Sequence, residues 1–441
     1  MTINPLDSAH KHYESSHKIE MHIQYMPRAL SSAPTCRQMS STSYKNRLRI
    51  AIVFTLLSSY LVLKHLSSIL MPSNREKSDL SRYTNSIFLP YVHKFHTQHV
   101  PMVHATISGI DFELPMDTGS TGVMIGAPRL PHISPDEGIP AYEYLSSSRI
   151  LYSGRLVDQN ITFHGADGTY AMAAVPILVV DRSMVCPWYK PGVDGFECPH
   201  IPGRPYPEPR DVSHITYMGV GFGRNRLEDK KLKALPRGNP FLNVASINGV
   251  ALPSGSLRAG YTISTLGVHL GLTRDNTIGF LFTDLERGAT SDARDWAMMK
   301  TCFRINGQGN NCGSALIDTG IPQMYIRTDV GVDLPNVTVR NPNRESETEW
   351  VKRVKPGTDI TIGFPTLEGS EHVVGYSFKV DQGLSVMEPA YVVPEAQAPP
   401  PYVNTGRNFL FSLSVAFDAE GGRFGLKPLH SPSSQTVPSS L

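Results

Sequence analysis

Two short stretches combine residue types and a spacing that could support hydrolytic chemistry. MDTGSTG spans residues 116–122 and IDTGIPQ spans residues 317–323, and each places Asp-Thr-Gly at the end of an apolar run. Subtracting 117 from 318 puts Asp117 and Asp318 201 residues apart, which is about one domain length. Two carboxylates about 3 Å apart cannot both ionise, so the charged one can activate a water while the protonated one polarises a peptide carbonyl. One copy alone would be an ordinary turn after a strand; the pair predicts a catalytic dyad.

The residues beside the two aspartates suit a pair of facing loops. Gly119 and Gly320 permit the tight turns that bring the carboxylates together. Thr118 and Thr319 carry hydroxyls that can hydrogen-bond across to the opposite loop. These four residues are therefore predicted to support the dyad.

Most of the chain after residue 99 has the pattern of short strands separated by turns. Runs of β-branched and aromatic residues are bounded by Gly, Pro or Asn, and helical signals are few. FELPMDTGSTGVMIG and SALIDTGIPQMYIR each consist of an apolar strand, Asp-Thr-Gly and a second apolar strand. The sequence therefore predicts an all-β fold built from a duplicated unit, with each copy supplying one aspartate.

From about residue 100 to residue 428 the chain resembles the pepsin-like aspartic peptidases, particularly the secreted fungal members. The motifs that carry the resemblance are MDTGSTG, IDTG, GVGFG at 219–223, NPFLN at 239–243 and FLFSLSVAFDAEGGRFGLKP at 409–428. The resemblance implies a bilobal fold with the dyad in a cleft between two β-lobes. We place the peptidase domain at 99–428, with lobes at 99 to about 240 and about 241 to 428, and a tail at 429–441.

Within this resemblance, a glycine is expected to pass behind each catalytic loop, and Gly221 and Gly406 fit that role. Asn404 and Thr405 stand where the family has apolar residues. Ser120 is expected to hydrogen-bond the outer oxygen of Asp117, a contact that Ile321 cannot make in the second loop. Removing a hydrogen bond to a charged carboxylate raises its pKa, so we expect a shifted pH profile.

The hairpin that closes over substrate in this family departs from the pattern. An ungapped count puts Ser147 at the position of the usual tyrosine, and Tyr144 or Tyr152 could substitute if the hairpin tip is rebuilt. The partner tryptophan is replaced by Met124. We therefore expect the usual flap anchor to be absent. We also expect no conventional propeptide, because only 72–99 lies between the apolar segment and the first lobe.

An apolar segment precedes the predicted domain. Residues 50–71 follow three basic residues and have the order of a signal sequence or signal anchor behind a basic region. Residues 1–49 would be a cytosolic tail, unless translation begins at Met39. Residues 72–98 would be a spacer. We expect a single-pass membrane protein with a lumenal or extracellular catalytic domain, or a secreted one if 50–71 is cleaved.

The cysteines and sequons agree with a secretory route. Four cysteines follow the apolar segment as two local pairs, which favours disulfides although three connectivities are possible. Two sequons predict glycosylation. The cysteines are Cys186, Cys198, Cys302 and Cys312, and the sequons begin at Asn160 and Asn336.

Composition excludes some classes of partner. The chain has 41 Lys and Arg against 39 Asp and Glu. This near balance gives no strong positive electrostatic field of the kind that indicates a nucleic-acid partner. The histidines at 93, 96, 99 and 104 match no ligand spacing, and we expect neither metal nor cofactor.

Two hypotheses follow. The first is an aspartic endopeptidase, a monomer that binds a peptide or protein substrate, attaches to membrane through 50–71 and uses Asp117, Asp318 and a water. The second is a pepsin-fold binding protein with weak or no activity, which Ile321 and Met124 would favour.

Overall fold

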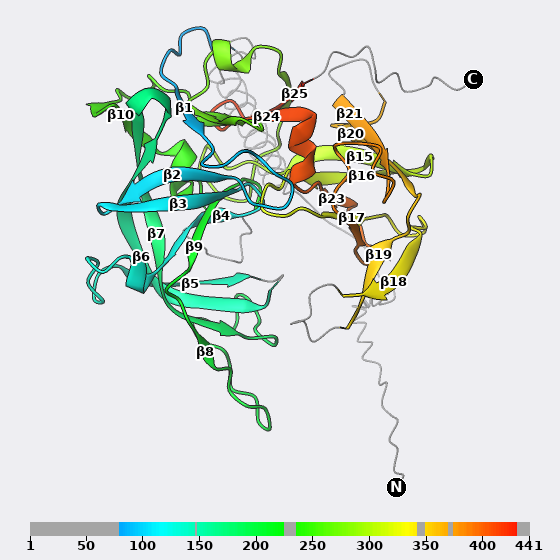
Figure 1. Cartoon of the computed structure of the whole chain (residues 1–441), viewed down its shortest axis with the longest axis horizontal. Helices are drawn as coiled ribbons and strands as arrows, with labels where there is room; N and C mark the ends of the chain where they lie inside the picture. Colours follow the sequence, from blue (N-terminus) through cyan, green and yellow to red (C-terminus); the bar gives the residue numbers. More distant parts are fainter. Residues whose placement is uncertain (1–78, 146–147, 225–234, 342–348, 369–373, 430–441) are drawn as a thin grey trace, which may run out of the picture. The chain divides into compact units, whose positions relative to one another are not determined.

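The computed structural model describes residues 79–145, 148–224, 235–341, 349–368 and 374–429. The predicted tail at 1–49, the apolar segment at 50–71, Ser147 and residues 430–441 lie outside these ranges. In the described part the chain is all-β, which confirms this part of the predicted fold (Figure 1). Its helices are short 3-10 segments: η1 (Ala127–Arg129), η2 (Ala166–Gly168), η4 (Pro236–Gly238), η5 (Pro240–Leu242), η6 (Asp275–Thr277) and η7 (Arg407–Phe411).

Among the described residues, no helix has the length and apolar character that a membrane crossing requires.

The largest sheet has ten strands and carries Asp117. Pairing of β6 with β7 closes the path β7-β4-β9-β3-β2-β6 into a ring, so this sheet is barrel-like. Its strands are β2 (Met102–Ile107), β3 (Ile110–Asp117), β4 (Thr121–Gly126), β5 (Ile139–Leu145), β6 (Ile150–His164), β7 (Tyr170–Val185), β8 (Pro209–Arg210), β9 (Thr216–Val220), β10 (Val244–Ile247) and β11 (Val250–Ala251).

A seven-stranded sheet leads to Asp318, and a separate two-stranded sheet is formed by β18 (Asn336–Arg340) and β19 (Trp350–Val354). Figure 1 shows the seven-stranded sheet in yellow to orange and the ten-stranded one in blue to green. The seven strands are β15 (Met299–Ile305), β16 (Gln308–Leu316), β17 (Met324–Arg327), β20 (Asp359–Phe364), β21 (Val374–Lys379), β22 (Val392–Pro394) and β23 (Tyr402–Asn404).

A six-stranded sheet combines both ends of the described chain. Strand β1 pairs with β13 at its edge, so a strand lies inside the segment that was expected to be a spacer. Leu80 and Tyr83, just before β1, pack on Leu272. The six strands are β1 (Ile87–Pro90), β12 (Gly260–Ile263), β13 (Gly267–Leu270), β14 (Leu281–Asp284), β24 (Leu413–Asp418) and β25 (Arg423–Pro428).

Both aspartates follow hairpins of the same type. The β2–β3 turn uses Ser108 and Gly109, and the β15–β16 turn uses Asn306 and Gly307, all with positive φ. Such two-residue turns match the right-handed twist of the strands they connect, and glycine takes the left-handed conformation without strain. Each hairpin therefore delivers its second strand to an Asp-Thr-Gly loop.

The strands around the two loops repeat one pairing pattern. β3 pairs parallel with β9, while β4 pairs antiparallel with β9 and parallel with β7. In the second copy β16 pairs parallel with β23, while β17 pairs antiparallel with β23 and parallel with β22. A third strand thus separates the two strands that flank each aspartate. The repetition agrees with the duplication seen in the sequence.

Candidate active site

The two aspartates occupy equivalent places in their loops. Asp117 ends β3, and Asp318 lies just beyond the end of β16. The Gly119 N–H donates to Asp117 Oδ1 at 2.7 Å, and the Gly320 N–H donates to Asp318 Oδ1 at 2.8 Å. One oxygen of each carboxylate is therefore held by its own turn.

The threonines link the two loops across 201 positions of sequence. The Thr118 N–H donates to Thr319 Oγ1 and the Thr319 N–H donates to Thr118 Oγ1, each at 3.0 Å. Each hydroxyl then donates onward, from Thr118 to the Ile317 carbonyl at 2.6 Å and from Thr319 to the Met116 carbonyl at 2.7 Å. Both side chains are buried, so this reciprocal set fixes one loop against the other.

The glycines bring each loop against the opposite carboxylate. A Cβ added to Gly119 would overlap the Asp318 carboxylate, and one added to Gly320 would overlap the Asp117 carboxylate. Only glycine leaves room for this approach. The structure thus assembles the six residues predicted as dyad and close supports, namely Asp117, Thr118, Gly119, Asp318, Thr319 and Gly320.

The second oxygen of each carboxylate is held by a residue that the sequence analysis did not assign to the site. The Tyr217 hydroxyl donates to Asp117 Oδ2 at 2.8 Å, and Asn404 Nδ2 donates to Asp318 Oδ2 at 2.6 Å. The Gly406 N–H donates to Asn404 Oδ1 at 3.1 Å, which orients the amide with its NH₂ group toward Asp318. In the second loop Asn404 therefore supplies a hydrogen-bond donor to the aspartate, which the side chain of Ile321 cannot do.

Ser120 does not make its predicted contact with Asp117. Its hydroxyl is buried and finds no hydrogen-bond partner within the described ranges. It is near enough to Tyr217 to lower the pKa of that phenol, but not in hydrogen-bond geometry. The prediction is wrong because Tyr217, which comes from β9 rather than from the loop, occupies the outer oxygen of Asp117.

The electrostatic environment of the two carboxylates is unequal. Asp318 is 6% exposed, whereas Asp117 is half-buried. Burial, followed by repulsion from the Asp117 carboxylate, raises the pKa of Asp318 above its usual 3.8, although the Asn404 and Gly320 donors oppose the shift. Burial and the adjacent Asp117 charge raise the pKa of the Tyr217 phenol, which stays a donor. A carboxyl that keeps its proton beside a second carboxyl is the arrangement that acid–base catalysis requires.

The glycines expected behind the loops lie against them. The Gly221 N–H donates to the Ser120 carbonyl at 2.8 Å, and a Cβ there would overlap the Thr118 carbonyl. Gly406 has a φ of 67°, and a Cβ there would approach the Gln323 carbonyl closely. Each glycine allows a neighbouring strand to support its loop at backbone distance.

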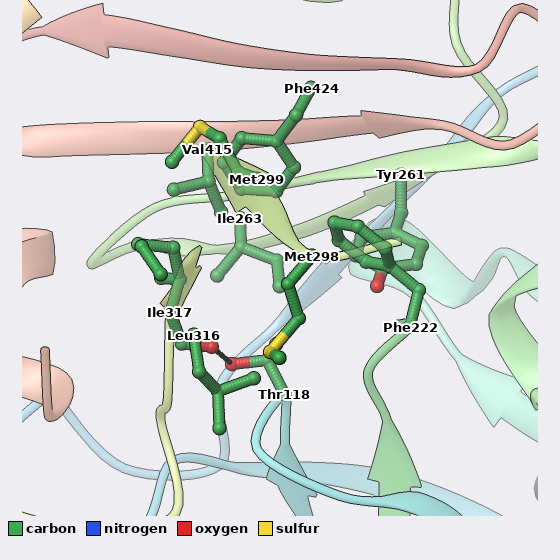
Figure 2. A pocket seen from close by; sticks show the side chains of 11 residues that line it. Thr118, Phe222, Tyr261, Ile263, Met298, Met299, Leu316, Ile317, Val415 and Phe424 are labelled. Atoms are coloured by element: carbon green, nitrogen blue, oxygen red, sulfur yellow. Dashed lines mark hydrogen bonds between the residues drawn. The ribbon is translucent and has the colours of Figure 1, made fainter. Parts of the chain in front are cut away.

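A small apolar cavity of about 20 Å³ lies beneath the loops (Figure 2). Thr118 contributes to its wall, together with Leu316, Ile317, Phe222 and Met298. The hydrogen bond from the Thr118 hydroxyl to the Ile317 carbonyl lies at its edge. Thr118 therefore has apolar surroundings on this side, and the burial of both threonines keeps water from their hydrogen bonds.

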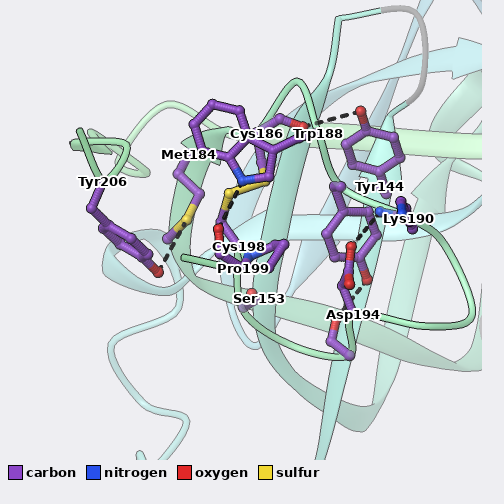
Figure 3. The surroundings of a disulfide bond; sticks show 12 residues. Tyr144, Ser153, Met184, Cys186, Trp188, Lys190, Asp194, Cys198, Pro199 and Tyr206 are labelled. Atoms are coloured by element: carbon purple, nitrogen blue, oxygen red, sulfur yellow. Dashed lines mark hydrogen bonds between the residues drawn. A yellow bond between two sulfur atoms is a disulfide. The ribbon is translucent and has the colours of Figure 1, made fainter. Parts of the chain in front are cut away.

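The flap candidates belong to the hairpin formed by β5 and β6. The Tyr144 hydroxyl donates to the Cys186 carbonyl at 3.2 Å, and its ring lies 4.7 Å from that of Tyr189 (Figure 3). Tyr152 packs on an apolar cluster that contains Met124 and also contacts Tyr217. Tyr144 thus anchors the hairpin to a disulfide loop, and Tyr152 packs on the same apolar cluster as Tyr217, whereas Ser147 lies outside the described residues.

The disulfide prediction is confirmed in its local pairing. Cys186 bonds Cys198 and Cys302 bonds Cys312, with sequence separations of 12 and 10. Cys302 and Cys312 are also cross-strand partners in β15 and β16. The sequon residues Asn160 and Asn336 are exposed on β6 and β18.

A scan against protein-family models finds no match to this chain, and a search of curated proteins finds none either. The assignment of a function therefore depends on the geometry of the site.

Proposed function

We propose that the chain is an aspartic endopeptidase of the pepsin-like class, with the two β-units as lobes and an extended peptide bound between them. The observation that carries the proposal is the reciprocal bonding of Thr118 and Thr319, which sets Asp117 and Asp318 in facing loops. A packed core would gain nothing from two acidic groups held together in this way, since each raises the cost of ionising the other.

In the proposed reaction the two carboxyls share one proton. Asp318 holds it, because this carboxyl is the more buried of the two and its pKa is raised. Asp117 takes a proton from a water as the water oxygen bonds to the peptide carbonyl carbon, while Asp318 donates its proton to the carbonyl oxygen. Asp117 then donates the proton it took to the amide nitrogen, while Asp318 takes a proton from a hydroxyl of the tetrahedral intermediate. The C–N bond breaks, an amine and a carboxylic acid leave, and the dyad returns to its starting protonation state.

The test is hydrolysis of a diverse peptide library by the full-length protein between pH 3 and pH 7.5. We expect cleavage that is inhibited by a peptide in which a hydroxyl-bearing tetrahedral carbon replaces the scissile carbonyl. Asp117→Asn is the matched inactive variant. A folded protein that cleaves no peptide at any of these pH values would refute the proposal, and peptide binding without cleavage would favour the binding-protein hypothesis.

A further inference from the structure

Arg407 is a buried cation attached to the second catalytic loop. It is the first residue of η7, directly after Gly406, and only 2% of it is exposed. Its Nε donates to the Thr319 carbonyl at 3.0 Å and its Nη2 to the Gly320 carbonyl at 2.6 Å. Its backbone N–H donates to the Ile321 carbonyl at 2.9 Å. Arg407 thus binds all three residues that follow Asp318.

The other buried arginines are neutralised by a carboxylate. Arg258 and Arg423 both pair with Asp418, and Arg155 pairs with Asp181. Arg407 forms no ion pair within the part of the chain that the structure describes. An unpaired buried charge costs several kcal/mol unless nearby charges compensate it. Backbone carbonyls accept its hydrogen bonds, so any compensating negative charge comes from groups that do not bond it directly.

The dyad lies close to Arg407, which bonds the carbonyls of the two residues directly after Asp318. Burial lowers the pKa of Arg407, and the carboxylates of Asp318 and Asp117 act in the opposite direction. Glu388 lies before β22, and its backbone carbonyl accepts from Asn408, the residue after Arg407. Its carboxylate is engaged by the N–H groups of Gln382 and Gly383. The negative charge that acts on the Arg407 guanidinium is therefore assigned to the carboxylates of Asp117 and Asp318.

The remaining titratable groups face the site from other elements. Tyr217 on β9 donates to Asp117, and Tyr402 on β23 interacts with Arg224 and Asp318. Arg407 Nη1 donates to the Thr97 carbonyl at 3.1 Å, in a connector that also carries His96 and His99. Of these groups, Arg407 combines a permanent charge with direct bonds to the loop of Asp318.

We propose that Arg407 is a positioning residue that supplies the counter-charge of the dyad and fixes the loop of Asp318. This inference rests on the proposed peptidase function. A buried cation favours the ionised form of neighbouring carboxyls, so it opposes the effect of burial on the dyad. The singly ionised dyad then forms at a lower pH than burial alone would allow.

The test is a carbon-13 NMR titration of the aspartate carboxyls in the full-length protein and in Arg407→Met. Removal of the charge should move the titration of the dyad upward by about one pH unit, since an opposite charge nearby lowers a carboxyl pKa by roughly 1–3 units. Arg407→Lys should restore much of the shift because it keeps the charge with fewer hydrogen bonds. The acid limb of the activity profile should move in the same direction.

Arg258→Met is the matched control, because it removes a buried arginine whose partner Asp418 keeps Arg423. It should lower stability and leave the dyad titration unchanged. The proposal is overturned if Arg407→Met, or Arg407→Gln where the first variant does not fold, titrates like the wild type. The titration needs no turnover, so a chain that cleaves no peptide still gives an answer about Arg407.

Discussion

The loop at 116–122 and the loop at 317–323 share their backbone bonding and differ in the side chains that reach their carboxylates. Each has a glycine N–H on one carboxylate oxygen and a threonine bonded across to the other loop. Asp117 receives a phenol from Tyr217 and is only partly buried. Asp318 receives an amide from Asn404 and is buried, and Arg407 bonds the two residues that follow it. The two loops thus share one backbone geometry, and the residues that they do not share give each carboxylate a different donor.

The largest effect is expected when either carboxyl is replaced. Asp117→Asn and Asp318→Asn should each lower kcat/KM by about 10³-fold or more, because residues that act as one unit cannot replace each other. Peptide hydrolysis by folded variants, checked by circular dichroism, measures this effect. Substantial activity in one variant alone would show that the two loops do not act as a pair.

The two disulfides close loops of similar length, one in each of the two large sheets' regions, so removal of each can be compared directly. Cys186→Ser with Cys198→Ser, and Cys302→Ser with Cys312→Ser, should each lower the free energy of unfolding by about 3 kcal/mol, because the closed loops have similar lengths. Urea unfolding measures the loss. Only the first pair should increase hydrogen exchange in β5, since Tyr144 bonds the Cys186 carbonyl. Equal exchange in both double variants would contradict that link.

The threonines test whether the two loops support each other equally. Thr118→Val and Thr319→Val should each lower stability by about 2 kcal/mol, because each leaves a buried N–H of the opposite loop without its acceptor. Thermal unfolding is the measurement. Thr118→Ser and Thr319→Ser keep the hydroxyl and serve as controls. A loss confined to one threonine would show that the support is one-sided.

The smallest effect is expected at the outer oxygens. Asn404→Leu removes a donor from Asp318, so the ionised carboxylate loses stabilisation and its pKa rises. Asp318 then keeps its catalytic proton to higher pH, and the alkaline limb of the activity profile should move upward by about one pH unit. Tyr217→Phe should change the profile less, because Asp117 is only partly buried and water can replace the phenol. The pH profiles of kcat/KM measure both shifts. Ser120→Ala is the control, and its pH profile should match that of the wild type. A larger shift in Tyr217→Phe than in Asn404→Leu would show that the donor to Asp117 matters more than the donor to Asp318.

The residues that could be predicted from the sequence are those that belong to a short, contiguous sequence pattern. Asp-Thr-Gly after an apolar strand is a local pattern, and its repetition identified the dyad, the threonines and the glycines. Tyr217 and Asn404 lie 100 and 86 residues from the carboxyls they bond, and such distances depend on which strand lies beside which. Asn404 gave a signal, as a polar residue at an otherwise apolar position. Tyr217 gave none, because tyrosine is ordinary in a strand.

The threonine bonds join residues 201 positions apart, and the strands behind the loops are paired across about a hundred residues. Contacts of such long range form late in folding, because the chain must lose the entropy of closing large loops before they are made. A nascent chain that has folded only its first unit holds one aspartate without its partner. The proposed hydrolytic activity therefore requires that both units are synthesised and folded before the first peptide can be cleaved.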